Sequence, residues 1–201
     1  MTTMSYALAV ALGYLLGGIP FGYLIGRRAG VDIRTRGSGN IGATNVWRTL
    51  GAKAGLLCYT LDMAKGAGPV LGMLLAAGER PAIVAGAFAV LGHMYPAWLG
   101  GRGGKGVATA AGAFAVLAPL PFLHAVLTFA VVGPLATRTV SAGSIAAALI
   151  LPWSAWHSET PEVFLLALLA GGLTIWRHRA NLERLAAGTE SRIWNGLSPG
   201  E

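Results

Sequence analysis

Three segments of this chain combine glycine or amide groups with basic side chains, a combination suited to binding phosphate. The first lies between Arg27 and Lys53 and contains the run RGSGNIGATNVWRTLG. The second is LGGRGGKGVATAAG, residues 99–112, and the third is RHRANLERLAAGTE, residues 177–190. Glycine-rich backbone can point successive N–H groups into one concavity, and a following helix N-terminus adds its positive dipole end. These segments are therefore where we expect chemistry.

The first segment spells G-x-G-x-x-G at Gly37, Gly39 and Gly42, and Asp62 follows where a dinucleotide-binding fold keeps its ribose-binding acid. That fingerprint works only where it closes a strand and opens a helix. Here it follows a basic stretch, and Asp62 lies inside an apolar run that must be helical in lipid. The pattern therefore does not indicate a nicotinamide enzyme.

An anion site explains the first segment better than a flexible connector does. Neutral polar side chains stand among its glycines, and Arg48 falls on the same face as Thr44 and Asn45 if residues 43–50 are helical. Arginine offers a planar fork that suits phosphate. The sequence therefore predicts a phosphate-binding turn followed by a short helix.

The second segment adds Arg102 and Lys105 to its backbone donors just before a helix start. It is not a Walker A loop, because Lys105 is followed by Gly106 rather than by Ser or Thr, so no nucleotide is implied. Taken alone, a glycine turn with ordinary basic membrane anchors explains this segment equally well.

The third segment predicts a helix ending near Gly188, because His178, Asn181, Leu182 and Leu185 recur at spacings of three and four. A basic amphipathic helix lying on anionic lipid is the simplest interpretation. Its alternative is a functional His178, which could bind phosphate as a cation or exchange a proton near neutral pH.

The composition is that of a membrane protein: 54% of the 201 residues are hydrophobic and 11% are charged, against about 25% charged in soluble domains. A turn at Pro119 gives seven spans and places thirteen of the 15 basic residues on one face. The positive-inside rule then sets the N-terminus outside and the C-terminus in the cytoplasm. We expect an all-α integral membrane protein with one domain, residues 1–201, its active site at the cytoplasmic face, and spans near 4–26, 54–78, 81–99, 105–118, 121–137, 140–157 and 161–177.

Several other polar residues lie within or beside these spans. Asp62 and Lys65 stand three apart in the second span and are expected to form a neutralising pair. Cys58 is interpreted as core packing. His93 could line a site or bond a neighbouring helix. We expect structural roles for His124 and His157, expect Ser141 and Ser144 to join the cytoplasmic cluster, and expect no metal or cofactor.

Taken together, the three segments GSGNIGATNVWRTLG, GHMYPAWLGGRGGKGVATAAG and HRANLERLAAGTE resemble the three cytoplasmic motifs of the bacterial acyl-phosphate:glycerol-3-phosphate acyltransferases, the PlsY family. The resemblance covers essentially the whole chain. It implies transfer of a fatty acyl group from acyl phosphate to the 1-hydroxyl of glycerol 3-phosphate, giving lysophosphatidic acid and phosphate. This is the first step of bacterial phospholipid synthesis, in the cytoplasmic (inner) membrane.

The resemblance also implies a set of site residues. Ser38, Lys105 and His178 are expected to be catalytic. The residues expected to bind glycerol 3-phosphate, besides those three, are Arg48 and Asn181, with Asn45 and Ser141 nearby. Those expected to hold the acyl phosphate or its charge are Gly39, Asn40, Gly42, Ala43, Thr44, Arg102, Gly103 and Gly104.

Acyl phosphate is a mixed anhydride and is already activated, so the enzyme needs proximity, charge neutralisation and a proton acceptor. His178 and the leaving phosphate are the two candidate bases. Because no serine has the surroundings of a nucleophile elbow, we predict direct transfer without an acyl-enzyme.

The expected partners are the two substrates, membrane lipid and an enzyme that supplies acyl phosphate; nucleic acid is not expected. The main rival function is a transporter for anions or phosphate esters, although polar groups gathered on one face argue against a midplane site. A structural anchor for other lipid-synthesis enzymes would leave the loop chemistry unexplained.

Overall fold

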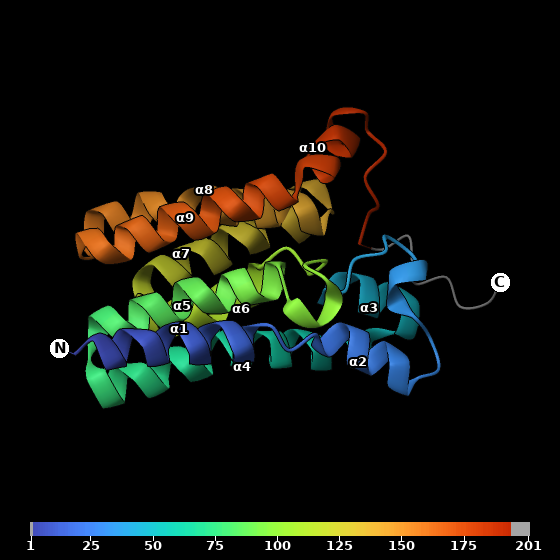
Figure 1. Ribbon diagram of the computed structural model, residues 1–201. Coiled ribbons are helices and arrows are strands. Elements are labelled where there is room, and N and C mark those ends of the chain that lie inside the picture. The colour runs from blue at the N-terminus through green and yellow to red at the C-terminus, as the bar shows by residue number, and fades with distance from the viewer. Residues whose placement is uncertain (1, 194–201) are drawn as a thin grey trace. The chain divides into compact units, whose positions relative to one another are not determined.

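The computed structural model describes residues 2–193, and within that range the chain is helical and contains no strand. The chain divides into two compact units, Met1–Pro119 and Leu120–Glu201, each of which is described by itself. The helices of the first unit are α1 Thr3–Gly17, α2 Phe21–Arg28, α3 Ala43–Leu50, α4 Ala52–Ala77, α5 Glu79–Met94 and α6 Val107–Leu117, with single 3-10 turns at Ile33–Thr35 and Ala97–Leu99 (Figure 1). Those of the second are α7 Pro119–Ala130, the π-helical turn η3 Val131–Thr137, α8 Val140–Ser158, α9 Pro161–Arg177 and α10 Arg179–Ala186.

The first expected span, residues 4–26, is not one continuous helix. It is interrupted between α1 and α2, where Pro20 has no N–H to donate and lies just before the first residue of α2. Gly18 closes α1 through its N–H bond to the carbonyl of Tyr14, at 2.8 Å. At the break the carbonyl of Ile19 accepts the N–H of Phe21 at 3.1 Å, and its second lone pair can accept from a side chain.

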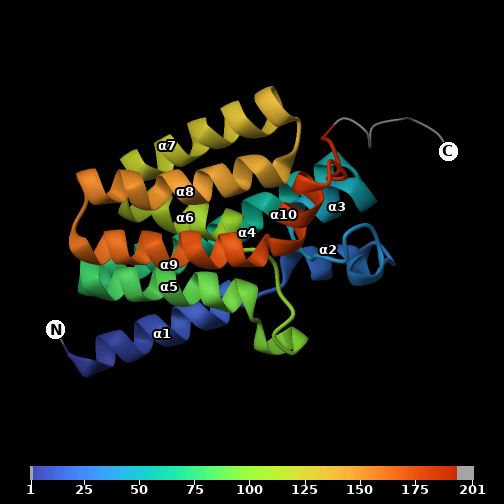
Figure 2. The same ribbon diagram turned by 90° about the horizontal axis from the view of Figure 1, so that it is seen from above.

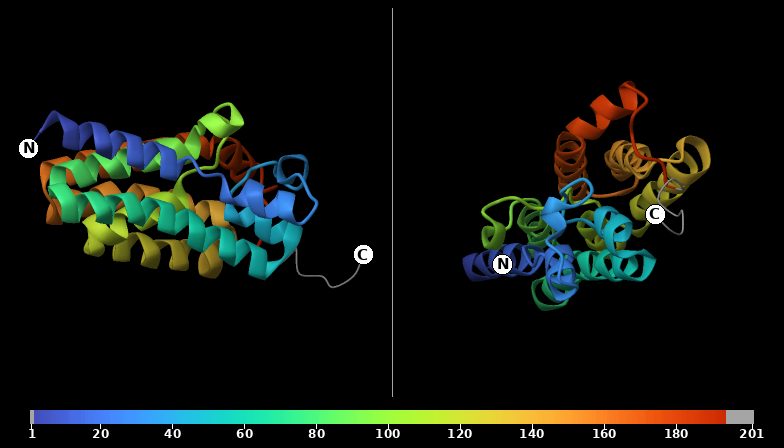
Figure 3. Two further views of the ribbon diagram at one scale, coloured as in Figure 1. Left: turned by 60° about the horizontal axis from the view of Figure 1, so that its bottom comes forward. Right: turned by 90° about the vertical axis from the view of Figure 1, so that its right-hand side faces the viewer.

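Small residues let the helices of the first unit approach closely. α1 packs on α5, and α4 packs on both α5 and α6 (Figure 3). A Cβ placed on Gly17 would collide with the carbonyl oxygen of Ala89 in α5, and one on Gly66 would collide with that of Thr109 in α6. Such contacts let dispersion forces replace the hydrophobic effect that lipid does not supply.

In the second unit, α8 packs against α9 and against the turn η3 (Figure 2). α7 begins at Pro119, the position where the sequence predicted a turn, and proline favours the first position of a helix. At the other end, Thr137 Oγ1 donates to the carbonyl of Val132 at 2.7 Å, and Arg138 adopts the left-handed conformation with a φ of 57°. The chain therefore reverses sharply before α8.

Three segments of the described residues are long and apolar enough to cross a membrane: Thr3–Arg28, Glu79–Leu99 and Pro119–Thr137. α6 is apolar but shorter. Large apolar side chains such as Leu75 and Leu135 are 79% and 74% exposed, as expected of a surface that contacts lipid. The all-helical fold is as predicted, whereas the count of seven spans and their orientation stay predictions.

Candidate active site

The first glycine segment is organised around one buried amide, that of Asn45 in α3, which is 2% exposed. Its Oδ1 accepts the N–H of Ser38 at 2.9 Å. Its Nδ2 lies 3.1, 3.0 and 2.9 Å from the carbonyl oxygens of Ile33, Arg36 and Asn40. One side chain therefore fixes the path of the loop that precedes α3. The sequence led us to expect Asn45 at the substrate, whereas in the structure its amide bonds the loop itself.

The glycines of this loop serve that arrangement. Gly37 has a φ of 54°, and a Cβ there would collide with Asn45 Oδ1, so only glycine fits. The N–H of Gly42 donates to Asn40 Oδ1 at 2.8 Å, and the N–H of Gly39 donates to the carbonyl of Arg36 at 2.9 Å. Two of the amides expected to hold phosphate thus hold the loop itself.

Ser38 and Arg48 stand on the exposed side of this loop and helix. α3 covers residues 43–50 as predicted, so Thr44 and Arg48 share a face four residues apart. The first-turn amides of α3 belong to Ala43 and Thr44, the kind of donors that an α-helix leaves without an intrahelical partner. This is the part of the segment best suited to receive an anion.

A neighbouring arginine is already committed to another partner. The carboxyl of Asp32 accepts hydrogen bonds from the side chain of Arg34, the shorter at 2.7 Å, and from its backbone N–H at 3.0 Å. These bonds, the side-chain ones first, lower the pKa of Asp32 to about 2. Arg34 also lies 4.6 Å from the centre of the Tyr23 ring, so its guanidinium is engaged on two sides.

The second glycine segment is fastened to the end of α5. The N–H groups of Gly103 and Gly104 donate to the carbonyls of Met94 and His93, both at 3.1 Å. A Cβ on Gly104 would collide with the Nε2 edge of the His93 ring. Lys105 follows immediately and is half-buried. The close packing of Gly103 and Gly104 against the end of α5 therefore fixes the backbone position from which the Lys105 side chain extends.

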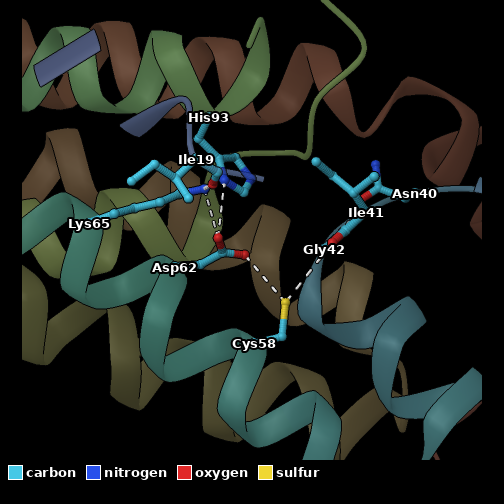
Figure 4. A network of polar contacts seen from close by, with 8 residues as sticks. All are labelled: Ile19, Asn40, Ile41, Gly42, Cys58, Asp62, Lys65 and His93. Carbon is cyan, nitrogen blue, oxygen red and sulfur yellow. Dashed lines mark hydrogen bonds and ion pairs between the residues drawn. The ribbon is translucent and has the colours of Figure 1, made fainter. Parts of the chain in front are cut away.

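A buried polar network within the first unit joins α4 and α5 to the break between α1 and α2 (Figure 4). Lys65 Nζ lies 2.7 Å from Asp62 Oδ1 and donates to the carbonyl of Ile19 at 2.6 Å, at the break between α1 and α2. His93 Nδ1 lies 3.7 Å from the same Asp62 oxygen, and the Cys58 thiol lies 3.6 Å from Oδ2. The predicted Asp62–Lys65 pair is confirmed, and His93 is its neighbour.

In the second unit, Glu190 joins residues from separate helices. Its Oε1 accepts from Ser141 Oγ at 2.9 Å and from Asn181 Nδ2 at 2.7 Å, while Oε2 accepts from Arg184 Nε at 2.7 Å. Burial alone would raise the pKa of Glu190, but these hydrogen bonds and the charge of Arg184 hold it below its usual value. Glu190 thus assembles Ser141 and Asn181, two residues predicted for the site, and was itself missed.

His178 stands at the junction of α9 and α10, is 3% exposed, and has Nδ1 2.8 Å from the carbonyl of Thr174. A carbonyl oxygen can only accept, so Nδ1 carries a proton in this contact. α10 then covers the predicted helix, with Gly188 beyond its end at a φ of 69°. The hydrogen bond to Thr174 therefore fixes the orientation of the His178 ring at the junction of the two helices.

The structural role expected for His124 agrees with its contact in the structure. Its Nδ1 lies 2.8 Å from Ser154 Oγ, thirty residues away in α8. Ser154 is buried, and no carboxylate among residues 2–193 bonds this pair. A serine and a histidine without an orienting acid fit a structural link between α7 and α8.

The predicted site residues therefore fall into two sets. The first unit contains the two glycine segments, with Gly39, Asn40, Gly42, Ala43, Thr44, Asn45, Arg48, Arg102, Gly103, Gly104, Ser38 and Lys105. The second unit brings together Ser141, His178 and Asn181. That both sets serve one site stays a prediction. Residues 2–193 contain no cluster of three side chains that could hold a metal ion.

Comparison with known proteins identifies the family. Residues 7–188 match the family model described as glycerol-3-phosphate acyltransferase. This chain belongs to that family. Glycerol-3-phosphate acyltransferases of Agrobacterium fabrum and a Synechococcus species are 45% and 48% identical to it, over 93% and 92% of this chain and 91% and 94% of theirs. The resemblance predicted from the three motifs is confirmed.

Two solved structures of a member of this family, PlsY, an integral membrane glycerol 3-phosphate acyltransferase, resemble this chain. Its glycerol 3-phosphate form has a TM-score of 0.90 at 41% identity, covering 94% of this chain and 96% of that one. Its lysophosphatidic acid form has a TM-score of 0.87 at 40% identity, covering 94% and 95%. With its apolar helices, the chain is accordingly a membrane protein.

Proposed function

We propose that this protein transfers a fatty acyl group from acyl phosphate to the 1-hydroxyl of glycerol 3-phosphate, releasing lysophosphatidic acid and inorganic phosphate. The observation that carries the proposal is the family match over residues 7–188. The two ligand forms of PlsY, with glycerol 3-phosphate and with lysophosphatidic acid, are a substrate and a product of this reaction. The protein would work as a multi-pass protein of the bacterial inner membrane, with its polar face in the cytoplasm.

The residues of the first unit supply what an anhydride donor requires. Arg48 and Lys105 would neutralise phosphate charge, and the first-turn amides of α3 would add donors where negative charge develops on the carbonyl oxygen. Ser38 would orient glycerol 3-phosphate from a backbone position that Asn45 fixes. Since the donor is already activated, positioning and charge neutralisation account for most of the required acceleration.

The transfer is proposed to occur in one displacement. The 1-hydroxyl oxygen attacks the acyl carbon, the bond from that carbon to the phosphate oxygen breaks, and the hydroxyl proton passes to the departing phosphate or to His178 Nε2. Among residues 2–193, Ser38 has no hydrogen bond to a histidine or a carboxylate, the groups that activate a serine nucleophile. This supports direct transfer over an acyl-enzyme.

The test uses the purified full chain with palmitoyl phosphate and glycerol 3-phosphate, following phosphate release and lysophosphatidic acid together. The wild type is expected to make both in equal amounts, and Lys105→Ala to lose at least about 100-fold in kcat/KM if it removes a charge contact made in the transition state. Lys53→Ala is the matched control, because Lys53 is exposed at the start of α4. Absence of product from folded wild-type protein would refute the proposal.

The second candidate function, transport of a phosphate ester, is tested by flux of glycerol 3-phosphate into liposomes. It is favoured by the broken helix at α1 and α2, since transporters often bind substrate at interrupted helices. Flux without lysophosphatidic acid formation would support it against the acyltransferase.

A further inference from the structure

The carboxylate of Asp62 contacts three side chains that lead to three different parts of the first unit. Its Oδ1 pairs with Lys65, and its Oδ2 lies 3.6 Å from the Cys58 thiol. His93 Nδ1 stands 3.7 Å from Oδ1. All four side chains are buried, and Asp62 is 2% exposed. The acyl-transfer chemistry proposed above makes no use of any of them.

His93 connects this carboxylate to the second glycine segment. One edge of its ring, Nδ1, faces Asp62, while a Cβ on Gly104 would collide with the opposite edge, Nε2. The backbone carbonyl of His93 also accepts the N–H of Gly104 at 3.1 Å. The imidazole therefore fills the space between Asp62 and the residue immediately before Lys105.

Cys58 and Lys65 connect the carboxylate to the first segment and to the helix break. The Cys58 sulfur lies 4.0 Å from the carbonyl of Ile41, which immediately precedes the N-cap Gly42 of α3. Lys65 holds the carbonyl of Ile19, between α1 and α2. A single carboxylate thus links both glycine segments and the chain that leads into α2.

Stability does not explain this network well. An ion pair taken out of water loses hydration free energy comparable to what it gains, and apolar side chains of similar size often replace such a pair without loss. Polar side chains, unlike apolar ones, require particular partners at particular distances. A buried pair that reaches two loops is better suited to fixing their geometry.

We infer that Asp62, acting through Lys65, His93 and Cys58, is a positioning residue that holds residues 38–42 and 103–106 in register, so that Ser38, Arg48 and Lys105 form one phosphate-binding set. The inference rests on the proposed function for its kinetic consequence. Its structural consequence, ordering of both glycine segments, is independent of that function.

The decisive variant removes both charges at once, Asp62→Leu with Lys65→Met, in the full-length protein. Removing one partner, as in Asp62→Asn, leaves the other buried without its counter-charge and is expected to lower Tm. The double variant is expected to regain most of that Tm while the KM for glycerol 3-phosphate remains raised about tenfold. Wild-type KM in the double variant would overturn the inference, because the pair would then serve stability alone.

A second series keeps the test valid if the double variant does not fold. His93→Ala removes the link to Gly104, whereas His93→Asn retains an N–H near the place of Nδ1. We expect His93→Ala to raise KM about tenfold and His93→Asn to restore part of that loss. Equal loss in both would contradict a role through Asp62. The matched control is His124→Ala, a histidine of the second unit bonded to Ser154.

Amide hydrogen exchange separates this inference from the proposed function. Asp62→Asn and His93→Ala are expected to speed exchange in residues 38–42 and 100–106 while residues 66–76 of α4 stay protected. That result would stand even if the wild type made no lysophosphatidic acid, in which case the function alone would fail. Unchanged exchange in both glycine segments, with an active wild type, would overturn the inference alone.

Discussion

Replacing Asn45 by aspartate tests whether one buried amide shapes the first glycine segment. Asparagine and aspartate have the same shape, and Oδ1 would still accept the N–H of Ser38. The second oxygen would replace Nδ2 and would face the carbonyls of Ile33, Arg36 and Asn40, all within 3.1 Å of that nitrogen. Attraction at those contacts would become repulsion in a side chain that is 2% exposed.

The size of the effect follows from the hydrogen bonds lost. The two hydrogens of an amide nitrogen contribute about 1 kcal/mol each, and leaving the carbonyls unpaired adds about 1 kcal/mol or more. A weakening of about 3 kcal/mol corresponds to a factor of about 100, since about 1.4 kcal/mol is tenfold. We therefore expect kcat/KM of Asn45→Asp to fall about 100-fold as the ordered loop becomes a minor population.

The assay pairs steady-state kinetics with thermal unfolding and with hydrogen exchange of residues 36–42. Asn40→Asp serves as the stability control, because its Oδ1 still accepts the N–H of Gly42 and Tm should not change. Activity loss in Asn45→Asp with unchanged Tm and unchanged loop exchange would refute loop shaping. It would instead support the direct substrate contact that the sequence led us to expect.

Four further predictions follow from particular contacts. Gly66→Ala should lower Tm, at a cost of about 1–3 kcal/mol, because its Cβ would collide with the carbonyl of Thr109. Gly68→Ala in the same helix should leave Tm unchanged, because nothing lies within 4 Å of that position. Equal Tm changes in the two variants would contradict the close packing of α4 on α6. The pKa of Glu190 is depressed on folding, so its contribution to stability is present above the unfolded value of 4.5 and is lost as pH falls through the folded pKa. The protection of amides in residues 179–190, corrected for the intrinsic pH dependence of exchange, should therefore fall below about pH 4.5 in the wild type, and Glu190→Gln should lack that fall. Gly104→Ala should raise the KM for glycerol 3-phosphate at least about tenfold, because its Cβ would displace the ring of His93. A normal KM would contradict the inference that packing of Gly104 on His93 positions Lys105. Activity should survive EDTA, and loss that added divalent cation restores would contradict the metal-free mechanism.

The helices could be predicted from the sequence because lipid imposes a simple rule on long apolar runs. α3 and α10 were also predictable, since their polar residues recur at helical spacing. The interruption at Pro20 was not anticipated, because hydropathy averaged over a span does not register a break. The Asp62–Lys65 pair was predictable because both residues lie on one face of one helix.

The organisation of the candidate site could not be predicted in the same way. Asn45 bonds backbone groups five to twelve residues away in an irregular loop, where no periodicity indicates a partner. Glu190 meets Ser141 across forty-nine residues, and its only signal was a carboxylate in a basic segment. His93 and Gly104 are eleven residues apart, and their contact depends on how the chain turns after α5.

The most direct test of acyl transfer to the 1-hydroxyl uses glycerol 3-phosphate labelled with ¹⁸O in that hydroxyl, incubated with palmitoyl phosphate and the purified protein. Mass spectrometry of the products should find the label in the ester of lysophosphatidic acid and none in the released phosphate, because the hydroxyl oxygen attacks the acyl carbon. Label in a phosphorylated product without acyl ester would show attack at phosphorus, and it would contradict the proposed reaction.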